Sequence, residues 1–414
     1  MTKKQIQQLI NLETKRQQDG LVMIASENYA SLDVLQAMGT PLSNKYSEGY
    51  PGKRYYTGNE VIDQIENTAR ELALKMFNLS DKKWHVNVQP HSGSSANLAV
   101  YLGLLKPGDK ILGLDLGAGG HLTHGSAVNF SGKLFNFSHY SVDIKTGKLD
   151  YAEIDRIAKR EKPKMIVSGA TAYTQKINFK KISQIAKSIG AYHLADISHI
   201  AGLIIGEVHP SPFPNVDIVT TTTHKTLRGP RSAIIICKLE LAKSIDRAVF
   251  PGMQGGPLEN VIAAKAIAFS ETLTPKFKKD QKQTVDNAQM LAKVLMANGI
   301  KLVADSTENH LVLVDCCNLN ISGKIGAEAL AEAGIYTNAN MIPYDPATPL
   351  NPSGIRIGTP ALTTRGMKEK EIMIIGHWIA AILKDSSNKK LKQEIKSLVL
   401  KLTKKFPIYH NFKL

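Results

Sequence analysis

The sequence predicts an α/β protein with a largely parallel central sheet, and two observations lead to this fold class. First, short β-branched runs at 164–167, 192–195, 216–223 and 233–237 are typical of buried strands. Second, apolar residues recur at helical spacing through 179–189, between the first two of these runs. A strand, a helix and a strand at this spacing form a βαβ crossover, which makes the two strands parallel.

The C-terminal third changes character and predicts a second, smaller α+β domain. A long helix is expected over 281–298, a strand over 311–315 and a helix over 326–333. A chain of 414 residues is also longer than one typical domain. We therefore expect an N-terminal arm and large domain over 1–280 and a small domain over 281–414.

The chain is strongly basic, with 52 Lys and Arg against 36 Asp and Glu and a formal charge of +16. Its lysines are spread out and are densest at 389–405, where Leu391, Ile395, Leu398 and Leu402 recur at helical spacing. This pattern predicts a last helix with a solvated lysine face. Nucleic acid is therefore not expected to be the primary partner.

Three cysteines in 414 residues do not make a disulfide framework, and we expect them to be reduced, as in the cytoplasm. The longest nearly apolar run, 372–383, has twelve residues and is too short to span a membrane. No secretory signal is expected, because the N-terminus has no apolar core.

A lysine and an aspartate follow two neighbouring predicted strands. Lys225 comes after four threonines, and Asp196 ends the preceding strand. Ligands of parallel sheets bind at the carboxyl ends of strands. Desolvation there would make the lysine amine nucleophilic, and a carboxylate could keep a pyridinium nitrogen protonated. An edge-strand lysine and a helix-capping aspartate are the plainer alternatives.

Two other segments suit a phosphorylated, flat cofactor. Ser92 and Ser94 precede an apolar helical stretch, where free N–H groups bind anions, although a serine N-cap is commoner. His121 and His124 lie in a glycine-rich segment without a third metal ligand. No metal is therefore expected, and a histidine stacked on a cofactor ring is the better use.

Two further segments predict contacts to substrate. The segment 45–58 combines Tyr46, Glu48, Tyr55 and Tyr56 with three glycines, which is unusual for an ordinary surface loop. Arg356 lies between glycines, and its guanidinium matches a substrate carboxylate, with a structural ion pair as the alternative.

Together these segments resemble the serine hydroxymethyltransferase family, which has fold type I and uses pyridoxal 5′-phosphate (PLP). The resemblance runs from about residue 23 to residue 365. It rests on seven specific strings, at 24–28, 44–56, 89–94, 120–126, 220–231, 249–257 and 353–366.

The resemblance implies a large domain with a mainly parallel seven-stranded sheet and a set of cofactor residues. Lys225 would form the aldimine with PLP, Asp196 would pair with the pyridinium nitrogen, and His121 would stack on the ring. His199 would bond near the phenolic oxygen, and Thr171 would lie close to the cofactor. The phosphate would be held by Ser92, Gly93, Ser94 and His224, with Gly255 and Gly256 arriving from a partner subunit.

The remaining roles concern the substrates serine, glycine and tetrahydrofolate. Arg356 and Ser26 would bind the amino-acid carboxylate, and Thr222 would assist exchange at the lysine. Tyr46, Glu48 and Tyr56 would cross from the partner, with Glu48 as the proton-transfer group. The folate would face Glu48, Tyr55 and Asn340. Two complete sites would require an obligate homodimer, to which the family adds the option of a tetramer.

The chain departs from the family pattern around the site, and three readings of function stay open. Ala118, Gln175 and Ser232 stand where many relatives carry His, Arg and Gly. The leading reading is conversion of serine and tetrahydrofolate to glycine and 5,10-methylenetetrahydrofolate. The alternatives are a folate-independent PLP aldolase of β-hydroxy amino acids and a nucleic-acid-binding protein with a decayed site.

Overall fold

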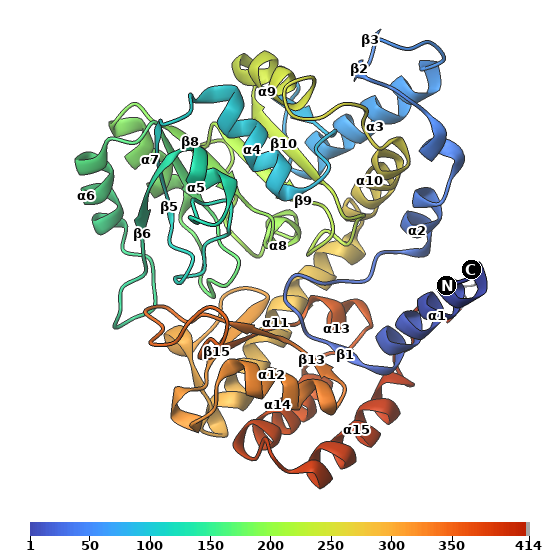
Figure 1. Cartoon of the computed structure of the whole chain (residues 1–414), viewed down its shortest axis with the longest axis vertical. Coiled ribbons are helices and arrows are strands. Elements are labelled where there is room, and N and C mark those ends of the chain that lie inside the picture. Colours follow the sequence, from blue (N-terminus) through green and yellow to red (C-terminus); the bar gives the residue numbers. More distant parts are fainter. Residues whose placement is uncertain (411–414) are drawn as a thin grey trace. The chain divides into compact units, whose positions relative to one another are not determined.

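A seven-stranded sheet forms the centre of residues 29–282, one of two units in the computed structural model, which describes residues 1–410. The strand order is β4-β10-β9-β8-β7-β5-β6 (Figure 1). Only β10 runs antiparallel to its neighbours; the pairs from β9 to β6 are parallel. The predicted α/β fold class is therefore confirmed.

The strands and helices of this unit follow the predicted alternation. Its strands are β2 Gly49–Tyr50, β3 Lys53–Arg54, β4 Trp84–Asn87, β5 Lys110–Leu114, β6 Asn136–Tyr140, β7 Met165–Ser168, β8 Tyr192–Asp196, β9 Ile218–Thr222 and β10 Ala233–Lys238. Its helices are α2 Leu32–Met38, α3 Glu60–Met76, α4 Gly93–Leu104, α5 Phe130–Leu134, α6 Tyr151–Glu161, α7 Phe179–Ser188, α8 Ala201–Ile205, α9 Ala242–Val249 and α10 Glu259–Thr272.

Helices cover both faces of the sheet. The alternating direction of the strand side chains shows which helix lies on which face. Leu194 and Ile218 belong to a core cluster with residues of α4 and α9. His193, one residue earlier on β8, contacts Ser183 of α7 instead. Consecutive strand residues point to opposite faces, so α4 and α7 lie on opposite sides. Asp196 has the parity of Leu194 and faces α4.

His193 makes the stability of this unit dependent on pH. Its ring nitrogens lie 2.7 Å from the hydroxyls of Ser168 and Ser183, and burial lowers the pKa of His193 to about 3. The unfolded histidine has a pKa of about 6.5. Between these values the unfolded chain binds a proton that the folded chain does not. The stability is therefore complete above about pH 6.5 and falls as the pH drops, by at most about 1.4 kcal/mol per pH unit.

We expect the His193→Gln variant to lose part of this pH dependence. Urea unfolding at about pH 7 and about pH 5 measures the difference. His377→Gln is the matched control, because His377 is exposed. Identical pH slopes in wild type and the His193 variant would contradict this prediction.

The second unit combines residues 1–28 with residues 283–414, of which 283–410 are described. It contains α1 Lys3–Asp19, β1 Leu21–Val22, β11 Lys301–Leu302, β12 Leu311–Asp315, α12 Gly323–Glu332, β13 Ile335–Tyr336, β14 Asn338–Asn340, β15 Gly354–Gly358, α13 Pro360–Thr364, α14 Glu369–Lys384 and α15 Lys389–Thr403. The boundary between the units falls within α11 Pro275–Ala297. The expected domain division at residue 280 stays a prediction.

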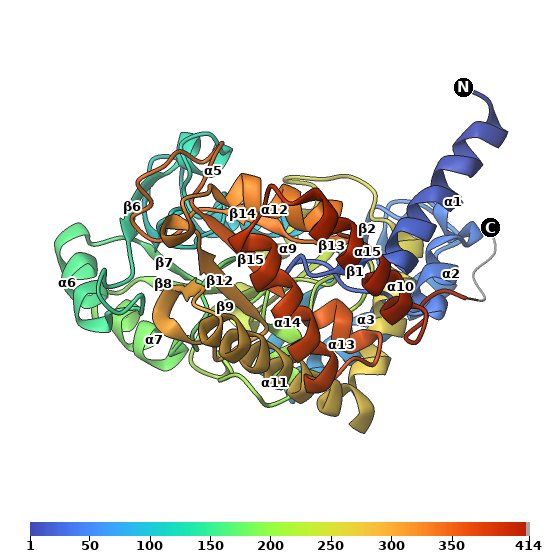
Figure 2. The same cartoon turned by 90° about the horizontal axis from the view of Figure 1, so that it is seen from below.

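Three sets of contacts join the N-terminal residues to later parts of the chain within this unit. The strand β1 pairs in parallel with β13, and α1 contacts α15 (Figure 2). Arg365 donates to the carbonyls of Gly20 (2.8 Å), Gln18 (2.9 Å) and Thr403 (3.1 Å). One buried guanidinium therefore satisfies carbonyls from both ends of the chain, as a planar donor set can.

The predicted last helix is confirmed as α15, but its buried face differs from the predicted one. Ile395 is buried as expected, whereas Leu398 is 41 % exposed. Lys392 is 7 % exposed, and its ammonium lies 2.7 Å from Glu332. The long lysine stem packs along apolar surface while its charge finds a partner. Within residues 1–410, no helix has the length and apolarity needed to cross a lipid bilayer.

Candidate active site

Asp196 is the last residue of β8, and three groups hold its carboxylate. Asn97 of α4 donates to Oδ2 (2.9 Å), and the backbone N–H of Ser198 donates to Oδ1 (3.0 Å). The Nε2 atom of His124 lies 3.3 Å from Oδ2. The amide of Asn97 also accepts from the hydroxyl of Thr220 on β9 (2.6 Å). The carboxyl ends of two neighbouring strands therefore share one network.

This network keeps Asp196 charged. Burial alone would raise the pKa of Asp196, because the carboxylate loses water. The hydrogen bond and charge of His124, the charge of His121 and the bond from Ser198 outweigh burial and hold the pKa well below its usual range. The group is therefore a buried anion at neutral pH.

The turn after β9 places Lys225 at the same edge of the sheet. Gly229 donates to the carbonyl of Thr223 (2.7 Å), and the Thr223 hydroxyl donates to the carbonyl of Pro230 (2.6 Å). These bonds close a turn around Lys225, which is half-buried. Thr222 donates from its hydroxyl to the Ser198 carbonyl (3.3 Å), which joins this turn to the segment after β8.

The N-terminus of α4 lies against this edge. A Cβ atom on Gly93 would lie 2.7 Å from the methyl group of Thr222, so the glycine permits a close approach. Ser92 caps the helix by accepting from the N–H of Ser95 (3.3 Å), as the plainer alternative expected. Ser92 and Ser94 are also exposed, so the cap leaves room for an anion.

Two histidines beside this helix have unused nitrogens. Nε2 of His91 and Nδ1 of His224 are buried and lack a hydrogen-bond partner within residues 1–410. Burial, Arg231 and Lys225 lower the pKa of His224 to about 3, and mainly burial lowers that of His91. Such unsatisfied buried nitrogens are costly unless a ligand contacts them.

His121 and Thr171 lie in the segments after β5 and β7. The His121 ring contacts the Thr123 hydroxyl (2.7 Å), and Thr171 donates to the carbonyls of Gly119 (3.2 Å) and Gly120 (3.1 Å). The predicted cofactor residues His121, Thr171, Asp196 and Thr222 therefore lie around neighbouring strand ends. The buried residue His199 follows β8 and accepts at its carbonyl from Thr226 (3.1 Å).

Sequence reasoning missed two members of the site. Asn97 has no predicted role, and His124 is predicted neither as a metal ligand nor as a partner of Asp196. Both lie close in sequence to predicted site residues: Asn97 comes soon after Ser92 and Ser94, and His124 is three residues after His121. No group of three or more metal-binding side chains occurs in the described part of the chain.

The tyrosine-rich segment 45–58 lies against Gly255 and Gly256 and forms a separate group with them. The rings of Tyr46 and Tyr56 lie 5.0 Å apart, and a Cβ atom on Gly256 would lie 3.4 Å from Tyr46. A Cβ atom on Gly255 would lie 2.9 Å from Oε1 of Glu48.

Tyr55 lies in the same group and is 76 % exposed, with its ring centroid 5.7 Å from that of Phe250.

Ser26, Arg356 and Asn340 belong to the other unit. Arg356 on β15 is buried, and its Nε donates to Asn338 (3.1 Å) of β14, the strand that ends at Asn340. Burial lowers the pKa of Arg356 to about 10, so the group is charged at neutral pH. The N–H of Gly358 donates to the carbonyl of Met23 (2.7 Å), three residues before Ser26.

Ser232, Gln175 and Ala118, which depart from the family pattern, have different structural environments. The hydroxyl of Ser232 donates to the carbonyl of Pro90 (2.9 Å) and accepts from Lys265 (3.0 Å), which ties β10 to the segment before Ser92. Gln175 is buried and donates to Thr174 (3.1 Å), and Ala118 is buried in the turn after β5.

The fold and the site define an α/β enzyme whose reactive groups lie at the carboxyl ends of parallel strands. The family model described as serine hydroxymethyltransferase matches residues 1–379. The chain therefore belongs to the serine hydroxymethyltransferase family. This confirms the predicted family, its one-carbon transferase class and its PLP fold type I.

Three curated relatives bear the name serine hydroxymethyltransferase. The protein of Methanosarcina barkeri is 53 % identical over 401 residues, covering 97 % of this chain and 96 % of the relative. That of Methanospirillum hungatei is 51 % identical, covering 99 % and 98 %. That of Acidobacterium capsulatum is 51 % identical, covering 97 % and 93 %.

Proposed function

We propose that this chain uses PLP to convert serine and tetrahydrofolate to glycine and 5,10-methylenetetrahydrofolate. The observation that carries the proposal is the buried Asp196 carboxylate, which Asn97, His124 and Ser198 hold at the carboxyl end of β8. The neighbouring strand β9 leads directly to Lys225. An anion of this kind matches the pyridinium nitrogen of PLP, and a lysine amine matches its aldehyde.

The residues of the α4 N-terminus fit the phosphate of this cofactor. The exposed Ser92 and Ser94 hydroxyls and the backbone at Gly93 would donate to phosphate oxygens. His224 has a buried nitrogen that a phosphate oxygen would satisfy. Gly255 and Gly256 of a partner subunit would complete this set. When bound, the cofactor supplies an electron sink for the substrate α-carbon.

The protein residues would bind serine and guide its protons. Arg356 would hold the substrate carboxylate, because a charged guanidinium forms two parallel hydrogen bonds with a carboxylate. Ser26 would assist it. Thr222 would assist the exchange of Lys225 for the substrate amine. His121 would stack on the cofactor ring, His199 would bond near its phenolic oxygen, and Thr171 would lie close to the cofactor.

Glu48 would transfer the proton as the one-carbon unit moves to folate with loss of water. Tyr46 and Tyr56 would orient the substrate beside Glu48. Folate would bind against Glu48, Tyr55 and Asn340.

We further propose an obligate homodimer, with a tetramer of such dimers as an option, in the cytoplasm. The proposal is supported by apolar surface on α1, which has no buried residue and exposes Leu9 by 52 % and Leu12 by 63 %. Tyr46 is also 55 % exposed, although its predicted role requires a partner. All three cysteines have free thiols, as expected in a reducing compartment.

The decisive experiment measures visible absorption and product formation in the purified protein. We expect added PLP to give a bound-cofactor band that changes with glycine and gains a strong long-wavelength band only when tetrahydrofolate is also present. Serine and tetrahydrofolate should then yield glycine. A response to glycine that ignores tetrahydrofolate, without folate-dependent turnover, would favour the aldolase. No PLP band, together with RNA binding at physiological salt, would favour the nucleic-acid reading.

A further inference from the structure

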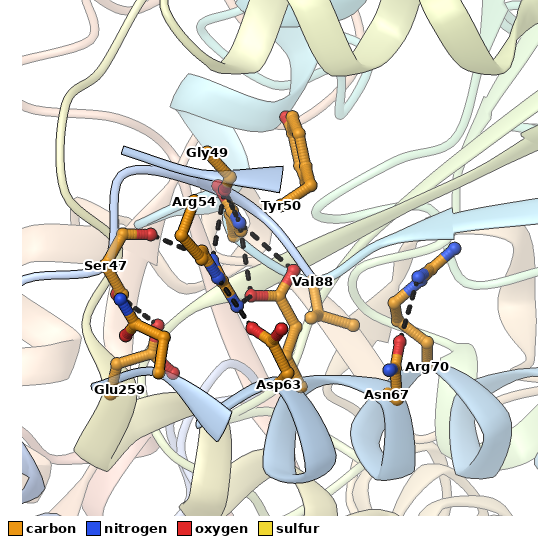
Figure 3. A network of polar contacts seen from close by, with 12 residues as sticks. Ser47, Gly49, Tyr50, Arg54, Asp63, Asn67, Arg70, Val88 and Glu259 are labelled. Carbon is orange, nitrogen blue, oxygen red and sulfur yellow. Dashed lines mark hydrogen bonds and ion pairs between the residues drawn. The ribbon is translucent and has the colours of Figure 1, made fainter. Parts of the chain in front are cut away.

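A buried ionic cluster lies beside the segment that carries Glu48. We define the Arg54 cluster as Arg54, Asp63, Glu66 and Gln89. Nε of Arg54 lies 2.9 Å from Asp63 Oδ1, and Nη2 lies 2.8 Å from Glu66 Oε2. The side chains of Arg54 and Glu66 are 4 % and 1 % exposed. Figure 3 shows the guanidinium between Gly49 of β2 and the carboxylate of Asp63.

The cluster holds the backbone on both sides of Glu48. Nη1 of Arg54 donates to the carbonyls of Ser47 (2.8 Å) and Gly49 (3.0 Å). Gln89 also donates to the Gly49 carbonyl (2.9 Å) and to Glu66 (3.0 Å). The carbonyl of Glu48 itself accepts from the N–H of Tyr55 (3.0 Å). Three consecutive carbonyls are therefore bound, which leaves mainly the side-chain torsions of Glu48 free.

This anchoring matters because the hairpin itself is short; beyond the Arg54 cluster, the Tyr50 hydroxyl donates to the carbonyl of Asp246 (2.7 Å) and accepts from Asn87 (2.9 Å). Its strands β2 and β3 have two residues each, and isolated hairpins of this size are marginal in water. The nearby Tyr55 and Tyr56 are exposed by 76 % and 46 % and add little core. Burial raises the pKa of Glu66 despite its Arg54 partner, so these charges form a desolvated pair rather than a surface contact.

A second anchor comes from the loop and helix that follow Gly255. The Ser47 hydroxyl donates to Glu259 Oε1 of α10 (2.5 Å). The Glu48 carboxylate lies against Gly255, where an added Cβ atom would be 2.9 Å away. The backbone and the carboxylate of Glu48 are thus located by different parts of one unit.

We propose that Arg54 is a positioning residue for Glu48: by binding the carbonyls of Ser47 and Gly49 while anchored to Asp63 and Glu66, it sets where the Glu48 carboxylate lies. The inference rests on the proposed function, in which Glu48 transfers a proton. Proton transfer requires heavy atoms within about 2.6–3.2 Å. A displacement of about 1 Å is enough to lower the rate about 10²-fold.

The test compares Arg54→Lys with Arg70→Lys. A lysine keeps the charge, but one ammonium cannot reproduce the planar set of bonds that Arg54 makes. We expect Arg54→Lys to lower kcat for serine cleavage about 10–100-fold, with KM for serine and PLP affinity changed less than about threefold. Arg70 is the matched control: it donates to the Val86 carbonyl and to Asn67 and, within residues 1–410, forms no hydrogen bond or ion pair with the hairpin (Figure 3).

A double-mutant cycle separates positioning from a general loss of structure. In the Glu48→Gln background, Arg54→Lys should lower kcat by less than about twofold, because the residue through which it acts is already gone. Equal losses in both backgrounds, or an equal loss from Arg70→Lys, would overturn the proposal, as would wild-type kcat in Arg54→Lys. If Arg54→Lys does not fold, Glu66→Gln is used in the same cycle with the same criteria. Absence of turnover in the wild type would instead refute the proposed function.

Discussion

Replacing Lys225 with alanine is expected to lower serine turnover about 10³-fold or more, because Lys225 is the amine that we propose attaches the cofactor. Lys265, a buried lysine of the same unit, is not expected to take over. Lys265 is fully buried, and its ammonium is already bound: it donates to the carbonyls of Val88 and Ala233 and to the Ser232 hydroxyl. The measurement is glycine formation from serine and tetrahydrofolate.

Covalent attachment is measured alongside turnover, by borohydride reduction and mass spectrometry of the modified peptide. Lys180→Ala is the matched control, since Lys180 is exposed on α7. A Lys225→Ala protein that still carries reducible PLP and turns over serine at the wild-type rate would refute the assignment of Lys225.

The Gly169→Ala variant is expected to be the most damaging single-methyl change near the site. Gly169 follows β7 with φ +126°, and an added Cβ atom would lie 2.0 Å from the carbonyl oxygen of Asp196. The backbone of one strand end must therefore move. We expect a loss of about 2–5 kcal/mol of unfolding free energy, from backbone strain together with overpacking.

Gly190→Ala separates these two causes in a urea-unfolding experiment. Gly190 has φ +71° and no heavy atom within 4 Å of the added Cβ position. Strain alone should cost about 1–2 kcal/mol there. If Gly169→Ala and Gly190→Ala lost the same stability, the proposed clash with Asp196 would be wrong.

The central sheet could be predicted from the sequence because its signals are local. The runs that became β7, β8, β9 and β10 are buried on both faces, which selects continuous apolar and β-branched residues. Asp196 and Lys225 were found by their places at strand ends. Their roles toward PLP stay predictions, and the geometry adds the partners Asn97 and His124.

The remaining features depend on contacts between residues far apart in the sequence. Arg54 lies in the family string at 44–56, but nothing local indicates that Glu66 and Gln89 meet it. The burial of Lys392 rather than Leu398 depends on Glu332, which lies on another helix. The pairing of Leu21 with Ile335 has no local signal at all.

The attachment of the N-terminal residues to later parts of the chain has a consequence for how the polypeptide is made. The carbonyls of Gln18 and Gly20 are bound by Arg365, which also binds the carbonyl of Thr403. A ribosome releases the N-terminal segment first, long before these binding partners are synthesised. The unit around residues 29–282 is contiguous in the chain and is able to assemble during translation, whereas residues 1–28 must wait until their partners in the second unit have been made. A segment that is made before the large unit therefore reaches its native contacts after that unit.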